Sequence, residues 1–202
     1  MVGRAQFGFV VAGALVAFSL GMGSLAAASK CDSGITKAEG KKIACKTAVF
    51  GKAEQKGNAV DTTKLDKCSA GFAKSCAKAA SAGGCTVQST NCTADETEAD
   101  TCVATLSGTP GATGSKCDSG ITKAAGKKVA CKTAVNAKAQ DKGGSPDSAK
   151  LTKCSDSFAK ACAKAKSAND CVIHTEDCAT AERNADTCVT NASASPSGAF
   201  VD

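Results

Sequence analysis

Apolar residues recur at helical spacing in the middle of the chain. Within residues 61–80 the apolar positions follow one another at intervals of 3, 4, 4 and 3, namely Leu65, Cys68, Phe72, Cys76 and Ala79. This spacing places all of them on one side of an α-helix, with polar positions on the other side. Asp61 precedes the pattern and is a suitable N-cap. The pattern predicts an amphipathic helix that buries one stripe.

Two further helices are predicted on either side of this stripe. Residues 33–56 are rich in Ala, Lys and Glu, which favour helix, and Gly57 follows as a helix-ending residue. Residues 94–106 form a shorter helical pattern with its inward positions at Ala99, Cys102, Val103 and Leu106. No stretch alternates between apolar and polar positions as a strand does. The predicted fold class is therefore all-α.

The same pattern is written twice. The letters "KCDSGITKA" stand at residues 30–38 and again at 116–124, and 44 of the 73 positions in 30–102 are identical to those 86 residues later. The apolar stripe returns as Leu151, Cys154, Phe158, Cys162 and Ala165. The sequence predicts a tandem duplication of a small three-helix unit. We expect one repeat at 29–106, a flexible Gly/Ser/Thr/Pro linker at 107–115, a second repeat at 116–190 and a disordered tail at 191–202.

Residues 1–28 belong to neither copy. Arg4 precedes the apolar run "FGFVVAGALVAFSL", and small residues follow before a cleavage position after Ala28. This arrangement is typical of a secretory signal peptide, and the run is short for a membrane span, which needs about 20 residues. An uncleaved membrane anchor is the alternative. We expect a secreted or periplasmic protein with no transmembrane segment in the mature chain.

Fourteen cysteines in an exported chain favour disulfide bonds. The seven cysteines of the first copy recur 86 residues later in the second, so their spacing is kept better than the other letters. The chain has no Trp or Tyr, and a domain of this size with so few aromatic residues buries only a thin core. Disulfides would then supply the missing stability. We expect Phe72 and Phe158, each midway along its stripe, to anchor the two cores.

An antiparallel pairing of the first two helices suggests which cysteines meet. It favours Cys31 with Cys85 and Cys45 with Cys68, and the return of the third helix favours Cys76 with Cys102. The second copy would then pair Cys117 with Cys171, Cys131 with Cys154 and Cys162 with Cys188. Six cysteines allow 15 connectivities, and Cys45 with Cys76 is the nearest alternative.

Seven is an odd number, so each copy leaves one cysteine over. We expect these to be Cys92 and Cys178, because they lie in the predicted loops. They would join the two copies to each other or link separate chains, which makes self-association possible.

No motif for a cofactor or for catalysis is present. The cysteine gaps of 13, 22, 7, 8, 6 and 9 residues contain no C-x-x-C pair, which zinc sites and thiol oxidoreductases use. His174 is the only histidine, its counterpart is Gln88, and we expect it to be an incidental residue of a surface loop. The chain is predicted to be no enzyme and to need no cofactor. The alternative for the cysteines is storage of a soft ion such as Cu(I).

Charge is the remaining feature that bears on function. Loss of Arg4 with the leader leaves 24 basic against 19 acidic residues. The first two predicted helices contain many lysines, whereas the third is acidic and could partly neutralise the lysine charge. Arg is nearly absent and no aromatic residues lie between the lysines, which disfavours sequence-specific nucleic-acid binding. The lysines would either keep the protein soluble or attach it to an acidic polysaccharide or another anionic surface. The sequence thus favours an exported structural or binding module.

Overall fold

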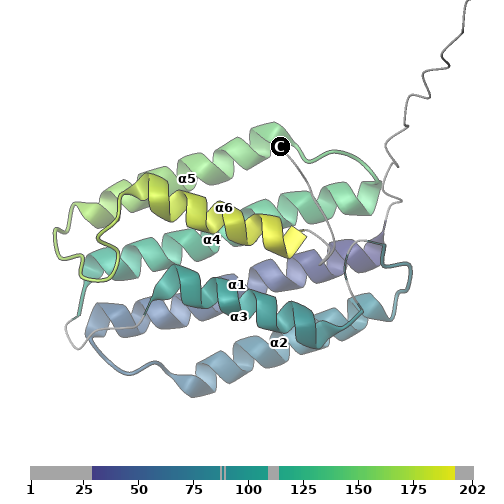
Figure 1. Ribbon diagram of the computed structural model, residues 1–202, viewed down its shortest axis with the longest axis horizontal. Coiled ribbons are helices and arrows are strands. Elements are labelled where there is room, and N and C mark those ends of the chain that lie inside the picture. The colour runs from purple at the N-terminus through teal and green to yellow at the C-terminus, as the bar shows by residue number, and fades with distance from the viewer. Residues whose placement is uncertain (1–28, 87, 89, 109–113, 194–202) are drawn as a thin grey trace, which may run out of the picture.

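The structure is a computed structural model that describes residues 29–86, 88, 90–108 and 114–193 (Figure 1). These residues form helices and no strand. The helices are α1 (Lys30–Lys56), α2 (Thr62–Ala80), α3 (Cys92–Ser107), α4 (Lys116–Lys142), α5 (Ser148–Lys166) and α6 (Cys178–Ser193). The predicted leader at 1–28, the centre of the predicted linker at 109–113 and residues 194–202 of the predicted tail lie outside the described residues. The first residues of that tail, 191–193, are not disordered, because they form the end of α6.

Capping residues set the helix ends. The Asp61 side chain accepts a hydrogen bond from the Lys64 amide, so it is the N-cap of α2 as expected. Gly57 ends α1 in the left-handed conformation, at φ 62°. The Ser29 side chain accepts from the Asp32 amide, and α1 therefore begins at Lys30, three residues before the predicted start. The Asn91 side chain accepts from the Thr93 amide in the same way, which starts α3 at Cys92 instead of residue 94.

Four helices lie side by side in the order α2, α1, α4 and α5, and the shorter α3 and α6 lie together across one face of this row (Figure 1). The central helices α1 and α4 run antiparallel. Two reciprocal backbone bonds tie their ends, from the Ser29 amide to the Gln140 carbonyl (3.1 Å) and from the Ser115 amide to the Glu54 carbonyl (2.8 Å). The residues of one bond are equivalent to those of the other at the 86-residue offset, so the interface between α1 and α4 is close to two-fold symmetric.

The first half (30–107) and the second half (116–193) have the same plan. Their helices have 27, 19 and 16 residues in both halves. Phe72 and Phe158 are each only 2% exposed, in the packing of their own half. One apolar cluster also crosses between the halves, because it contains α3 residues such as Val103 and Leu106 together with Val189 of α6. The halves therefore share part of their core.

Among the described helices, none is long and apolar enough to span a lipid bilayer.

Candidate functional site

Six disulfides staple the helices, three in each half. The structure has the pairs expected from the helical hairpin: Cys31–Cys85, Cys45–Cys68, Cys117–Cys171 and Cys131–Cys154. The third pair differs from the expectation, because Cys76 bonds to Cys92 and Cys162 bonds to Cys178. The free cysteines are Cys102 and Cys188.

The assignment of Cys92 and Cys178 as the odd cysteines is therefore wrong, and so is the pairing of Cys76 with Cys102. Cys92 lies in no loop. It is the first residue of α3, and its Cα lies 5.9 Å from that of Cys76 on α2. Cys102 stands ten residues later, about 15 Å further along the helix axis. The Cys162–Cys188 pairing fails in the second half for the same reason.

The two free cysteines lie against each other where α3 meets α6. Both are 3% exposed and belong to the apolar cluster that the two halves share. The Cys188 thiol is close enough to Cys102 to act on its pKa. The interaction with Cys188 and burial raise the pKa of the Cys102 thiol far above its ordinary value, so Cys102 is held as a neutral thiol.

Two lysines expected on the solvated face are buried instead. Lys42 and Lys128 are each 2% exposed. Lys42 pairs with Glu96 and Asp100 of α3, both at 2.9 Å, and its ammonium lies 5.2 Å from the centre of the Phe72 ring. The second half repeats this arrangement with Lys128, Glu182, Asp186 and Phe158.

These ion pairs confirm that the acidic third helix neutralises part of the lysine charge. Lys46 and Lys132 extend the pairing to Asp100 and Asp186, at 2.7 Å each. The signal was present in the sequence, because each lysine and each acidic partner recurs at the 86-residue offset. The spacing of the apolar residues alone does not indicate these ion pairs.

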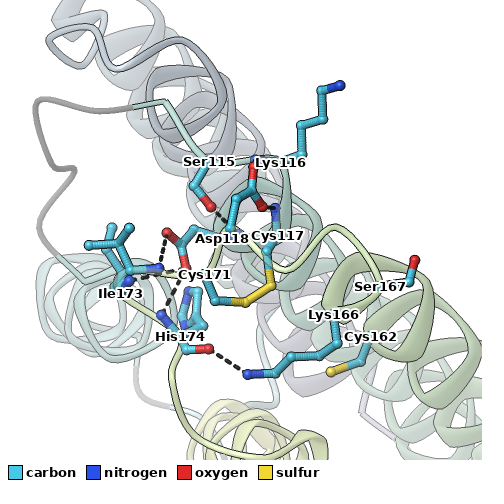
Figure 2. The surroundings of a disulfide bond; sticks show 12 residues. Ser115, Lys116, Cys117, Asp118, Cys162, Lys166, Ser167, Cys171, Ile173 and His174 are labelled. Atoms are coloured by element: carbon cyan, nitrogen blue, oxygen red, sulfur yellow. Dashed lines mark hydrogen bonds between the residues drawn. A yellow bond between two sulfur atoms is a disulfide. The ribbon is translucent and has the colours of Figure 1, made fainter.

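The loop after α5 is fixed on the start of α4 (Figure 2). The Asp118 carboxylate accepts hydrogen bonds from the backbone amides of Val172, Ile173 and His174, at 2.9 to 3.1 Å. Burial acts to raise the pKa of Asp118, but these backbone hydrogen bonds outweigh burial and hold that pKa below its usual value. The neighbouring Cys117–Cys171 disulfide fastens the same loop (Figure 2). His174 is thereby held in one place.

His174 is 6% exposed, so the expectation of an incidental surface histidine is wrong. Its Nε2 lies 2.8 Å from Thr122 Oγ1, and its Nδ1 lies 3.0 Å from a Glu176 oxygen. The Thr122 hydroxyl donates to Glu54 of the first half, at 3.0 Å. Burial raises the pKa of Glu54 to about 7, partly offset by this hydrogen bond. The result is a buried, titratable chain of groups between the halves.

The equivalent place at the opposite end of the α1 and α4 pair contains amides. There Gln88 replaces His174, and its side-chain amide donates to Thr36 (3.0 Å) and to the Ala192 carbonyl (3.1 Å). Gln140 stands where the first half has Glu54. Both polar ends thus join the halves, and only one of them titrates.

A third buried carboxyl lies on α1. Glu39 is 1% exposed, and burial, together with the nearby Asp95 and Glu98, raises its pKa to about 10. One of its oxygens has no hydrogen-bond partner among the described residues. The second half has Ala125 at this position. Within the described part of the chain, no three His, Cys, Asp or Glu side chains are grouped so that they could hold a metal ion.

Both outer helices of the row have exposed lysines, as the central helices also do. α2 has four lysines and one aspartate, and α5 has five lysines and one aspartate. Lys67, Lys74 and Lys78 of α2 are exposed, as are Lys153, Lys160 and Lys164 of α5. Within the described residues, none of these six forms an ion pair. We call these two groups the α2 edge and the α5 edge.

Comparison with known proteins gives no relative. No family model, no curated protein and no solved structure matches the chain.

Proposed function

We propose that the protein is an exported, non-enzymatic module, built by duplication of a three-helix unit, that attaches to acidic polysaccharides through its lysine edges. The leader at 1–28 would direct export and be removed. The six disulfides support an oxidising, extracellular setting.

The observation that carries the proposal is the difference between the two sets of lysines. Lys42, Lys46, Lys128 and Lys132 are used inside the fold, where acidic residues of α3 and α6 neutralise them. The lysines of the α2 edge and the α5 edge stay exposed and without such partners among the described residues. Exposed ammonium groups on a rigid helix attract a polyanion without reading its sequence. Such attraction weakens as salt rises, since the Debye length is about 8 Å at physiological ionic strength.

A column of sulfated dextran tests this function. We expect a variant with Lys74→Gln, Lys78→Gln, Lys160→Gln and Lys164→Gln to elute at clearly lower salt than the unmodified protein. The matched control replaces the same four lysines by Arg, which keeps the charge, and it should elute with the unmodified protein. Equal elution of the Gln variant and the unmodified protein would refute attachment through these edges.

Soft-metal storage is the weaker alternative. Twelve of the fourteen cysteines are in disulfides, so only Cys102 and Cys188 remain to bind such an ion.

A further inference from the structure

We propose that Cys102 and Cys188 form a seventh disulfide, which joins the two halves of the protein covalently. This inference rests on the proposed export into an oxidising compartment. It does not depend on the proposed attachment to polysaccharides.

None of the six disulfides crosses the junction between the halves, which only the peptide linker joins covalently. Each joins two cysteines of the same half, at sequence separations of 54, 23 or 16 residues. Among the described residues the halves are held by packing, by the ends of α1 and α4 and by the hydrogen bonds at Gln88 and Thr122. The only cysteines left over are one from each half.

The fold brings these two cysteines together through its symmetry. Cys102 and Cys188 occupy the same position of α3 and α6, 86 residues apart. A near two-fold axis sets equivalent residues opposite each other, and α3 and α6 lie together on the same face of the molecule (Figure 1). The neighbours of the pair on these helices are Ala99, Val103, Ala185 and Val189, all buried. Both cysteines lie in the apolar cluster where α3 contacts α6, and Cys188 is close enough to act on the pKa of Cys102, so closing the bond needs only a small approach.

The reaction is thiol–disulfide exchange with an external disulfide, either a small one such as glutathione disulfide or that of an export-pathway thiol oxidase. The thiolate of one cysteine attacks a sulfur of the external disulfide, which releases one thiol and leaves a mixed disulfide. The second cysteine, as thiolate, then attacks the protein sulfur of that mixed disulfide and releases the second thiol. Two protein thiols are oxidised to one disulfide, and one external disulfide is reduced to two thiols.

The exchange must take place while the halves are coming together. Both cysteines are 3% exposed in the folded protein, so an external disulfide has no access to them. The interaction with Cys188 and burial also raise the pKa of Cys102 and keep it protonated, and the thiol form is not the nucleophile. Before α3 and α6 pack, both obstacles are absent. A chain that folds in an oxidising compartment therefore passes through a stage at which this bond can close.

A cut in the linker tests the bond directly. A protease recognition sequence replaces residues 109–113, the protein is made with its leader and collected from an oxidising compartment, and it is digested and run on a denaturing gel without reductant. We expect the two fragments to migrate as one band, and to separate only when reductant is added. Separation of the fragments without reductant would overturn the proposal.

Variants and mass spectrometry complete the test. Cys102→Ser and Cys188→Ser should each let the cut halves separate without reductant, and either variant suffices if the other does not fold. Alkylation of the unmodified protein in denaturant should add no label, whereas two labelled thiols would refute the disulfide. Two thiols that become reactive only after a chelator removes bound copper would refute it in favour of metal binding. The same spectra show whether the leader was removed, which separates a failure of export from a failure of the cross-link.

Discussion

Glu39 shows how differently one residue can be treated in the two halves. It is almost fully buried, it lies near Asp95 and Glu98, and one of its oxygens lacks a hydrogen-bond partner among the described residues. Its counterpart is Ala125, which is also buried. The first half therefore contains a buried ionisable group at a place where the second half contains a methyl group.

We expect Glu39→Gln to stabilise the protein, and to do so increasingly as the pH rises. The pKa of Glu39 is about 10 in the folded protein against an ordinary value of 4.5. Above pH 4.5 the unfolded chain loses this proton while the folded protein retains it, so the free energy of unfolding falls as the pH rises towards 10. Glutamine is neutral at every pH, so the variant does not lose this part of its free energy of unfolding as the pH rises. The gain should exceed about 1 kcal/mol at pH 8, where one pKa unit corresponds to about 1.4 kcal/mol.

Thermal unfolding at pH 4.5 and pH 8 measures this difference. Asp66→Asn on α2 is the control, because it replaces an exposed carboxyl group by an amide, and it should change the two melting temperatures about equally. A stabilisation by Glu39→Gln that was the same at both pH values would show that Glu39 is not buried as a neutral acid.

At the scale of elements, the contact between α1 and α4 is set by small residues. A Cβ atom on Gly126 would lie 1.8 Å from the Thr47 hydroxyl oxygen, and one on Gly40 would lie 1.9 Å from that of Thr133. Thr47 is itself held, because its hydroxyl donates to the Ile43 carbonyl at 2.8 Å. The two helices can approach this closely only because no side chain stands between them.

Gly126→Ala should therefore destabilise the protein by about 1 to 3 kcal/mol, the range typical of overpacking. Gly71→Ala is the matched control, since a Cβ on this exposed glycine of α2 meets nothing within 4 Å. Within a helix that change should stabilise by about 0.5 to 1 kcal/mol. Denaturant unfolding of both variants measures the contrast. If both variants shifted the midpoint in the same direction, the close contact of α1 with α4 would be contradicted.

The helices were predictable from the sequence because their signals are local. The stripe from Leu65 to Ala79, the cap at Asp61 and the stop at Gly57 all act within a few residues, and the structure has a helix where each indicates one. The third disulfide was not predictable in this way. This disulfide depends on where α3 begins. The helix begins at Cys92, two residues before the predicted start, so Cys92 is part of the helix and bonds to Cys76 of α2, and Cys102 is left free.

The buried polar groups were missed for a related reason. His174, Lys42 and Glu54 are buried by the packing of α3, of α6 and of one half on the other, and that packing is set by contacts far apart in the sequence. Composition places lysine and glutamate at the surface by default. Only the joint recurrence of Lys42 with Glu96 and Asp100 at the 86-residue offset indicated that these residues act together.

At the scale of the whole molecule, the row of four helices has exposed lysines without ion-pair partners among the described residues at both of its ends. α2 contacts α1, and α5 contacts α4, and the central pair separates the two outer helices (Figure 1). The acidic helices α3 and α6 lie across one face of this row. The α2 edge and the α5 edge therefore lie on opposite sides of one rigid body, where a single short anion cannot reach both.

On the proposed function, this geometry makes one molecule bivalent, and we expect it to cross-link long polyanions. Two edges on opposite sides bind two segments at once, and the second attachment is strengthened by its high effective concentration. Mixing the protein with sulfated dextran at low salt should give turbidity that disappears when salt is added, because the attachment is electrostatic. Lys74→Gln with Lys78→Gln removes two of the three lysines of the α2 edge only, and Lys160→Gln with Lys164→Gln does the same for the α5 edge. Each pair should still bind the column but should lose most of the turbidity. Turbidity that persisted in either one-edged variant would contradict bivalence, and would point instead to self-association of protein molecules on a single polysaccharide chain.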